Sequence, residues 1–256
     1  MTTTSRPADA ALGRALALVR DLRARCSWDA AQTPDTLRPY LVEEALELDQ
    51  AIRSGDPRET TDELGDLLLQ LAFHIVIGEE RGTQDAETVT QGLERKMWRR
   101  HPHLFAAGEQ RESWEGLKRR ERGAGSSTLR GLPGTLPPLL MAYRLQERAA
   151  GVGFDWPDAT GPLAKVKEET AEVERESGGG RQETIDEELG DLLFAVVNLA
   201  RKLGVEPSQA LEKANDKFTK RFGAVERLAA ERGLELGRAT LAELDRLWDE
   251  VKAQSL

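Results

Sequence analysis

Two segments of this 256-residue chain occur twice, and each second copy lies 125 residues after the first. The first segment, at 41–48, reads LVEEALEL and matches VKEETAEV at 166–173. The second, at 61–73, reads TDELGDLLLQLAF and matches DEELGDLLFAVVN at 186–198. The offset is constant, because 166 − 41 and 186 − 61 both equal 125. A tandem duplication of this kind predicts two similar folding units, and two copies are too few for a solenoid.

The apolar residues of the chain recur at helical spacing. Leucine and valine fall three or four residues apart at the start of the chain, as in Leu12, Leu16 and Val19. Strands would show strict alternation of apolar and polar residues, and no segment has that pattern. Only 5% of the residues are aromatic, which argues against a β-sandwich or barrel. The prediction is an all-α fold of two tandem helical bundles.

A segment rich in glycine and proline separates the two copies of the repeat. It covers 123–138, reads GAGSSTLRGLPGTLPP, and contains four glycines and three prolines. This composition is typical of a linker. We therefore predict an N-terminal helical domain at 1–122, a linker at 123–138 and a C-terminal helical domain at 139–256.

Composition excludes several classes of protein. The net charge of −9 disfavours stable binding of nucleic acid, which needs a basic face. The one cysteine, Cys26, cannot form an internal disulfide, which favours a reducing, cytoplasmic setting. No stretch approaches the roughly 20 apolar residues of a membrane span. We expect a cytoplasmic protein that binds neither membranes nor nucleic acid.

Each copy of the repeat carries Glu-x-x-Glu in its first segment and Glu-x-x-Asp in its second. Residues three apart lie on one side of a helix, so two antiparallel helices would bring four carboxylates together. Their repulsion would raise some pKa values, and a hard divalent cation would remove it. Oxygen ligands suit Mg²⁺, with Mn²⁺ as an alternative. The predicted metal ligands are Glu44, Glu47, Glu63 and Asp66 in the first copy and Glu169, Glu172, Glu188 and Asp191 in the second.

The neighbourhood of the two aspartates favours a metal. Asp66 and Asp191 both stand inside apolar runs, so we expect their side chains to be buried. No arginine or lysine stands next to them in the sequence, and a buried carboxylate without a partner is costly. The alternative is that these acids cap helices or interact with helix dipoles. Capping explains Glu63 or Glu188 alone better than it explains two repeated sets of four.

The motifs resemble those of the MazG nucleoside triphosphate pyrophosphohydrolases. EEALE followed by DELGDLLLQ, and EETAE followed by DEELGDLLFAVVNLAR, carry the resemblance. It extends over almost the whole chain, through CSWDAAQT at 26–33, RRHPHLF at 99–105, VGFDW at 152–156 and KANDKFTKRF at 213–222. Ser27 departs from the family, which commonly has proline there.

This resemblance implies an all-α protein, usually dimeric, that uses magnesium to cleave nucleoside triphosphates to monophosphate and pyrophosphate. Metal ions would bind phosphate oxygens and activate the attacking water, and one glutamate could double as general base. Both tetrads are intact, but a longer basic stripe favours the second half as the main site. The predicted catalytic residues are Glu169, Glu172, Glu188 and Asp191.

A triphosphate also needs cationic contacts, because charge accumulates on its oxygens during transfer. Lysine and arginine four residues apart form one basic stripe late in the chain, and a tryptophan near the end of each half precedes a lysine by four. Such a tryptophan could stack on a base. A solvated basic face and tryptophans in a core are the alternatives. The predicted substrate-binding residues are Lys213, Lys217, Arg221, Trp248 and Lys252 in the second half and Lys96, Trp114 and Lys118 in the first.

Two further residues near the second tetrad are interpreted as structural. Trp156 is expected to be a packing residue. Asn198 is expected to be a satisfied polar residue rather than a ligand, although, two turns after Asp191, it could reach the site.

Other functions remain as alternatives. A di-iron bundle would need Glu-x-x-His motifs, and no histidine follows an acidic residue by three. An isoprenoid-diphosphate enzyme would need an aspartate-rich motif, which is absent. A helical regulatory or scaffold protein that binds metal without turnover fits the same tetrads. One half could also be catalytic and the other structural.

Overall fold

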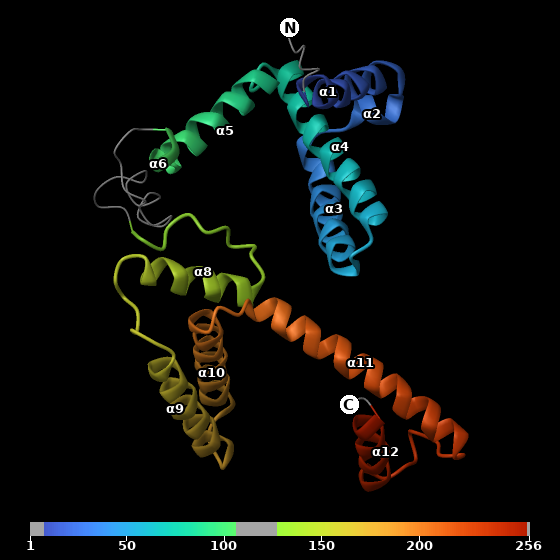
Figure 1. The fold of residues 1–256 in the computed structure, drawn as a ribbon, viewed down its shortest axis with the longest axis vertical. Helices are drawn as coiled ribbons and strands as arrows, with labels where there is room; N and C mark the ends of the chain where they lie inside the picture. The colour runs from blue at the N-terminus through green and yellow to red at the C-terminus, as the bar shows by residue number, and fades with distance from the viewer. Residues whose placement is uncertain (1–7, 106–126, 255–256) are drawn as a thin grey trace, which may run out of the picture. The chain divides into compact units, whose positions relative to one another are not determined.

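The computed structural model describes residues 8–105 and 127–254, and every regular element within these ranges is a helix (Figure 1). The all-α prediction is confirmed. The chain divides into two compact units, Met1–Arg111 and Glu112–Leu256. The predicted domain limits are not tested by this division and stay a prediction. Among the described helices, none has the length and apolar character that crossing a membrane requires.

The first unit is built around a helical hairpin. Its helices are α1 (Ala8–Arg25), α2 (Ser27–Ala31), α3 (Pro34–Ser54), α4 (Pro57–Arg81), α5 (Ala86–Arg100) and α6 (Pro102–Phe105). Helices α3 and α4 lie side by side, and α1 packs against α4 (Figure 1). Three helices meet in one apolar core, because α1, α3 and α4 each turn an apolar face inward. The buried residues of this core are Val19, Leu37, Ala72, Phe73, Val76 and Ile77.

The turn of the first hairpin follows from four residues, Ser54-Gly55-Asp56-Pro57. Gly55 ends α3 in the left-handed region, with φ of 73°, which a residue without Cβ adopts at little cost. Asp56 accepts a hydrogen bond from the backbone N–H of Arg58 and so caps α4. Pro57 occupies the first position of α4, where no N–H is needed. The chain therefore reverses within two residues, and α4 returns along α3.

The second unit repeats this hairpin. Its helices are α8 (Pro138–Ala150), α9 (Thr160–Ser177), α10 (Gln182–Lys202), α11 (Pro207–Glu231) and α12 (Leu241–Gln254). Helices α9 and α10 form the hairpin, and α8 packs against α10 (Figure 1). Helix α12 packs against α11. A second apolar core holds this pair together, and its buried residues are Val225, Ala229, Leu247 and Val251.

The repeat also includes the helix before each hairpin, which the sequence motifs do not reveal. Arg23 on α1 and Arg148 on α8 are 125 residues apart, and both are largely buried. Arg23 donates to the carbonyls of Asp29 and Gln32 at 2.7 and 3.2 Å. Arg148 donates to the carbonyls of the turn at 129–130. In each unit one buried guanidinium therefore satisfies backbone carbonyls of a neighbouring loop.

We expect Arg23→Ala to lower the free energy of unfolding by about 3 kcal/mol, because it leaves buried carbonyls without donors. It also removes the ion pair with Glu80, whose half-exposed carboxylate contributes little. Urea denaturation followed by circular dichroism measures the loss. Arg25→Ala is the matched control: its ion pair with Asp21 is exposed, so its removal should cost under about 0.5 kcal/mol. Equal losses in the two variants would contradict this role of Arg23.

Candidate metal centres

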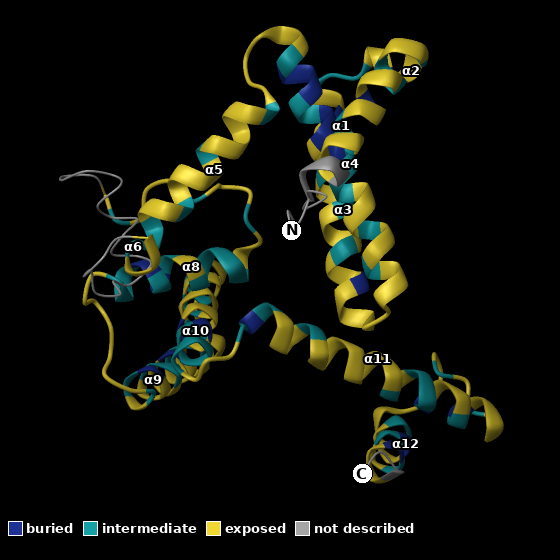
Figure 2. Cartoon of the chain, turned by 45° about the horizontal axis from the view of Figure 1, so that its top comes forward, coloured by how far each residue is buried: buried dark blue, intermediate teal, exposed yellow. Residues whose placement is uncertain are grey.

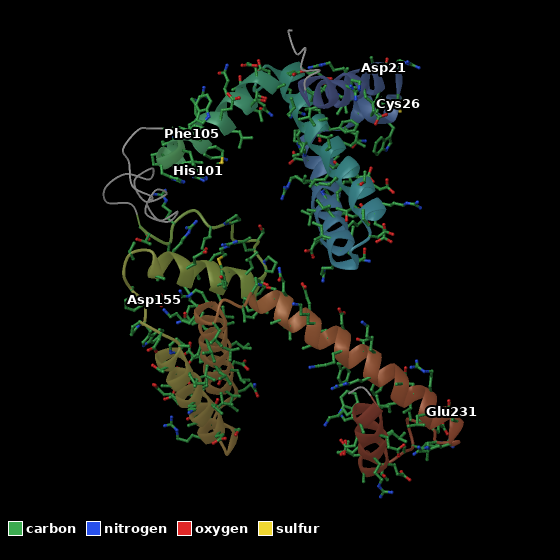
Figure 3. All side chains as sticks on the ribbon, viewed as in Figure 1. Asp21, Cys26, His101, Phe105, Asp155 and Glu231 are labelled. Atoms are coloured by element: carbon green, nitrogen blue, oxygen red, sulfur yellow. The ribbon has the colours of Figure 1, made fainter. Side chains whose placement is uncertain are left out.

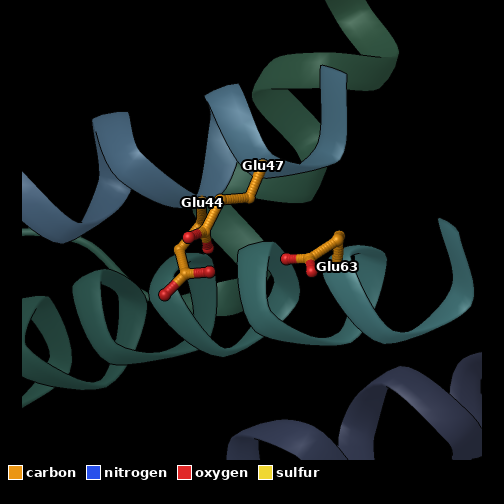
Figure 4. A group of neighbouring side chains, drawn as sticks. All are labelled: Glu44, Glu47 and Glu63. Atoms are coloured by element: carbon orange, nitrogen blue, oxygen red, sulfur yellow. The ribbon is translucent and has the colours of Figure 1, made fainter. Parts of the chain in front are cut away.

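The first hairpin brings acidic side chains of two helices together. Glu44 and Glu47 project from α3 toward Glu63 on α4 (Figure 4). Each of these three carboxylates has an oxygen within 4.8 Å of the others. Asp66 stands outside this compact group, yet its charge contributes to raising the pKa of Glu44. Three of the four predicted acids of the first tetrad therefore lie together in the hairpin.

The second hairpin contains a corresponding group. Oxygens of Glu169 on α9 and of Glu188 and Asp191 on α10 lie within 4.8 Å of one another. Glu169 also forms a group with Glu172 and the exposed Glu168 on its own helix. Unlike its counterpart Glu44, Glu169 is almost fully buried, with 3% of its surface exposed. The second group is thus set more deeply into its unit.

The crowding of carboxylates changes their proton affinity. Desolvation raises the pKa of Glu44, and the charges of its neighbours raise it further, while a hydrogen bond with Gln70 opposes them. Desolvation also raises the pKa of Glu63, followed by the charges of Glu47 and Asp66. In the second hairpin, desolvation and then the charge of Glu172 raise the pKa of Glu188. Both groups therefore favour a bound proton or a bound cation over free negative charge.

Helix capping does not account for these acids. Helix α4 begins at Pro57 and α10 at Gln182, so Glu63 and Glu188 each lie six residues inside a helix. Capping residues lie at the helix start, where the first N–H groups have no partner within the helix. The expected burial of the aspartates, however, is wrong. Asp66 and Asp191 are both exposed, because α4 and α10 each turn one face away from the core.

A lysine in the second hairpin was missed by the sequence argument. Lys165 lies one turn before Glu169 on α9 and forms an ion pair with it at 2.5 Å. This pairing raises the pKa of Lys165 above its usual range. The other carboxylate oxygen of Glu169, Oε2, is buried and has no hydrogen-bond partner in the described structure. One oxygen of a buried acid is therefore available to a further positive group.

A cavity of about 250 Å³ adjoins the second carboxylate group. It is bounded at one end by Lys165, Glu169 and Asp191 and elsewhere by apolar and amide side chains. Asn198 lines the cavity, and its Oδ1 accepts hydrogen bonds from Arg201, as expected of a satisfied polar residue. Trp156 lines the cavity and is 41% exposed, so its interpretation as a packing residue is incomplete. The remaining lining residues are Pro162, Phe194 and Ala195.

The residues at the matching positions of the first hairpin are larger. In the 125-residue register, Pro162, Ala195 and Asn198 correspond to Leu37, Gln70 and Phe73. These three first-hairpin residues are 2–7% exposed. Leu37 and Phe73 belong to the core that includes α1. Larger side chains therefore stand, in the first unit, at the positions that line the cavity in the second.

The predicted substrate-binding residues are distributed over several helices. Lys213, Lys217 and Arg221 lie four residues apart on α11, and Lys96 lies on α5. Within the described part of the chain, no hydrogen bond or ion pair joins the α11 stripe to the second carboxylate group. Trp114 and Lys118 lie outside the described residues.

Trp248 and Lys252 lie on α12. Trp248 contacts Phe218, with ring centroids 5.4 Å apart, and packs against the core between α11 and α12. Lys252 pairs with Asp249 at 3.6 Å. The contacts of Trp248 are those of a packing residue, and its role toward a base stays a prediction.

The chemistry of both groups fits a hard divalent cation. The ligands are carboxylate oxygens only, which Mg²⁺ and Mn²⁺ prefer. The buried, unpartnered Oε2 of Glu169 is the strongest single indication, because an orphaned buried acceptor is costly without a positive partner. Glu169, Glu188 and Asp191 are therefore the residues that would hold a cation in the second hairpin.

Magnesium should stabilise the folded chain by binding the folded state alone. When the magnesium concentration is one hundred times the dissociation constant of a site, that site raises the free energy of unfolding by about 2.7 kcal/mol. This gain is measured as a higher Tm. Glu169→Gln should remove the contribution of the second hairpin and leave that of the first. Glu44→Gln, the same change at the matching position, should do the reverse. Calorimetric titration of both variants measures this, and unchanged magnesium binding in both would contradict the assignment.

The raised pKa of Glu188 determines how the stability of the protein and its magnesium affinity should change with pH. Between the usual pKa of 4.5 and the raised pKa of Glu188, the folded state holds more protons than the unfolded state. Without metal, this group therefore stabilises at low pH, and its contribution is lost as pH rises through the raised pKa. Magnesium affinity should instead fall as pH falls, because protons compete for the same oxygens. Melting curves of wild type and Glu188→Gln at several pH values, with chelator, test the expected loss of stability as pH rises. The same curves with magnesium test the expected loss of magnesium affinity as pH falls.

Comparison with known proteins identifies the family. The model of the MazG nucleotide pyrophosphohydrolase domain matches residues 32–105 and 160–225, which contain both carboxylate groups. A MazG nucleoside triphosphate pyrophosphohydrolase/pyrophosphatase of Thermotoga maritima is 43% identical over 230 residues, 89% of each chain. A nucleoside triphosphate pyrophosphohydrolase of Escherichia coli is 41% identical over 93% of this chain and 94% of its own length. The uncharacterized protein YabN of Bacillus subtilis is 41% identical over 92% of this chain and 50% of its own. The chain therefore belongs to the MazG nucleotide pyrophosphohydrolase family.

Proposed function

We propose that this protein hydrolyses nucleoside triphosphates to monophosphate and pyrophosphate with Mg²⁺, and that the second hairpin is its main catalytic centre. One observation carries the choice of hairpin: a cavity adjoins the carboxylate group there, and larger side chains stand at the matching positions of the first. The family and the names of the two relatives that this chain matches over nearly their whole length support the reaction.

The residues of the second hairpin take separate roles in this proposal. Glu169, Glu188 and Asp191 hold the cation, which when bound supplies positive charge to the phosphates and acidifies water. Lys165 stands beside them at the cavity and neutralises phosphate charge. Glu172 lies outside the compact group and is the candidate general base that takes the proton of the attacking water. Water adds across the bond between the α- and β-phosphates, and pyrophosphate leaves.

The first hairpin takes a different role. Its carboxylates can hold a cation as those of the second can, but Leu37, Gln70 and Phe73 stand at the positions whose smaller counterparts line the cavity of the second. We assign it a structural or regulatory metal. The basic stripe of α11, Trp248 and Lys252 remain candidate contacts for the triphosphate. A cytoplasmic location suits an enzyme of the nucleotide pool.

Product analysis with a panel of nucleoside triphosphates tests the reaction and the choice of hairpin. We expect monophosphate and pyrophosphate with magnesium and neither with chelator. Glu188→Gln should lower kcat by about a hundredfold or more, because it removes an anionic ligand from the site. Glu63→Gln, the same change at the matching position of the first hairpin, should leave kcat within about threefold. Diphosphate and phosphate as products would reject the reaction.

The same assay separates the alternatives. Loss of activity in Glu63→Gln with retention in Glu188→Gln would move catalysis to the first hairpin. Magnesium-dependent stabilisation without turnover of any nucleotide in the panel would favour a metal-binding regulatory or scaffold protein.

We also propose that the protein is a homodimer that pairs along α10. Leu189, Leu193 and Val196 are 42–59% exposed and fall four and three residues apart, so they form one apolar stripe on that helix. Figure 2 shows that α10 carries exposed residues. Exposed apolar stripes of this kind are typical of subunit interfaces.

Leu193→Glu should shift the sedimentation coefficient from that of a dimer to that of a monomer. The matched change Leu203→Glu, at an exposed leucine just after α10, should not. A monomeric wild type would overturn the proposal.

A further inference from the structure

The cavity of the second unit contains one amide whose orientation is determined by its neighbour. Asn198 Oδ1 accepts hydrogen bonds from Nε and one terminal nitrogen of Arg201, at 3.0 and 2.8 Å. Arginine has donors only, so the amide must turn its oxygen toward Arg201. The Nδ2 group of Asn198 is then left without a described partner, on a side chain that lines the cavity. A ligand in the cavity would therefore meet the Nδ2 donor of Asn198, because its Oδ1 acceptor is occupied by Arg201.

A network of charged groups holds this amide in place. Asp155, labelled in Figure 3, accepts hydrogen bonds from both terminal nitrogens of Arg201. Lys202 donates to the same carboxylate and to the backbone carbonyl of Trp156. The side chains of Asp155, Arg201 and Lys202 are 12–22% exposed. One network therefore positions both Asn198 and the aromatic residue on the wall of the cavity.

The aromatic wall is itself tightly seated. The indole of Trp156 lies so close to Gly161 that a Cβ at this position would collide with the ring. Phe194 lies one turn before Asn198 on α10 and also lines the cavity. The cavity thus combines two aromatic rings with an amide donor of fixed orientation, which is how proteins bind a flat heterocycle with one selected edge.

The position of the donor relative to the metal ligands matches a nucleotide. Asp191 and Asn198 are seven residues apart on α10, about 10 Å along the helix axis. The ribose and the base of a nucleotide together span a comparable distance between the phosphates and the edge of the base. A triphosphate held beside Glu169 and Asp191 can therefore place its base in the cavity with its edge at Asn198.

We propose that this cavity is the nucleobase site of the second hairpin and that Asn198 selects bases carrying a ring carbonyl at the recognised edge. Nδ2 donates to a carbonyl oxygen but repels an amino group in the same place. The favoured bases are then hypoxanthine over adenine and uracil over cytosine. Arg201 and Asp155 are positioning residues. The inference rests on the proposed function, because it assigns the base-binding part of the same site.

The test compares kcat/KM for substrate pairs that exchange a carbonyl for an amino group. These are inosine and adenosine triphosphate, and uridine and cytidine triphosphate. Wild type should favour the carbonyl member of each pair by about threefold or more. Asn198→Asp has nearly the same shape and still pairs with Arg201, but it offers only acceptors. It should lower both ratios by about tenfold. Gln209→Glu, an exposed amide-to-acid change in the same unit, should leave them unaltered.

Two further variants separate selection from folding. Arg201→Met removes the group that orients the amide and should reduce both ratios, whereas a purely structural role would alter the Tm alone. Ala195→Gln introduces into the cavity the side chain that Gln70 has at the matching position of the first hairpin. It should raise KM for every triphosphate by about tenfold while calorimetric magnesium binding stays as in wild type.

The outcomes distinguish this inference from the proposed function. Turnover with ratios unchanged in Asn198→Asp would overturn the inference and leave the function standing. Absence of turnover in wild type would reject the function, and binding of inosine and adenosine monophosphate by calorimetry would then decide the inference. Tighter binding of inosine monophosphate by wild type, lost in Asn198→Asp, would support it. Equal binding of both monophosphates by both proteins would overturn it.

Discussion

Repulsion among carboxylates is the constraint on which each half of this protein depends. Helix pairing is stabilised mainly by apolar contact, yet each hairpin places three carboxylates within 4.8 Å of one another. Burial and mutual charge raise the pKa of Glu63 and of Glu188, its counterpart in the second hairpin. The free chain accommodates this with protons and with Lys165, and a divalent cation would do so more completely. The helices that pack behind the hairpins supply the apolar contacts that hold this arrangement.

The two hairpins share their acids and differ in what surrounds them. In the first, Leu37, Gln70 and Phe73 are buried next to the acids. In the second, smaller or polar residues at the same positions leave a cavity that opens on Glu169. In our proposal, a duplicated acidic group keeps its cation chemistry in both copies and only the second adjoins room for a nucleotide. The acids stand at matching positions in both copies, so the difference lies in the side chains around them.

In the second unit, one network of ion pairs both stabilises the fold and positions side chains of the cavity. Asp155 precedes α9, and its ion pairs with Arg201 and Lys202 tie that segment to the end of α10. These contacts stabilise the unit and at the same time turn the amide of Asn198 and hold Trp156 at the cavity. A change in this network would therefore affect base recognition before it affected the carboxylates, which lie about two turns away on α10.

The sequence by itself determined the duplication, the helical class and three of the four acids predicted for each compact group, because a constant offset and three-residue spacings survive in any helical pairing. It did not determine burial. Asp66 and Asp191 are exposed despite their apolar neighbours, because each hairpin helix is covered on one side only. The buried acid is Glu169, and its partner Lys165 lies outside the repeated motif. The cavity depended on tertiary structure alone, since its walls come from segments that meet only when α9 and α10 pair.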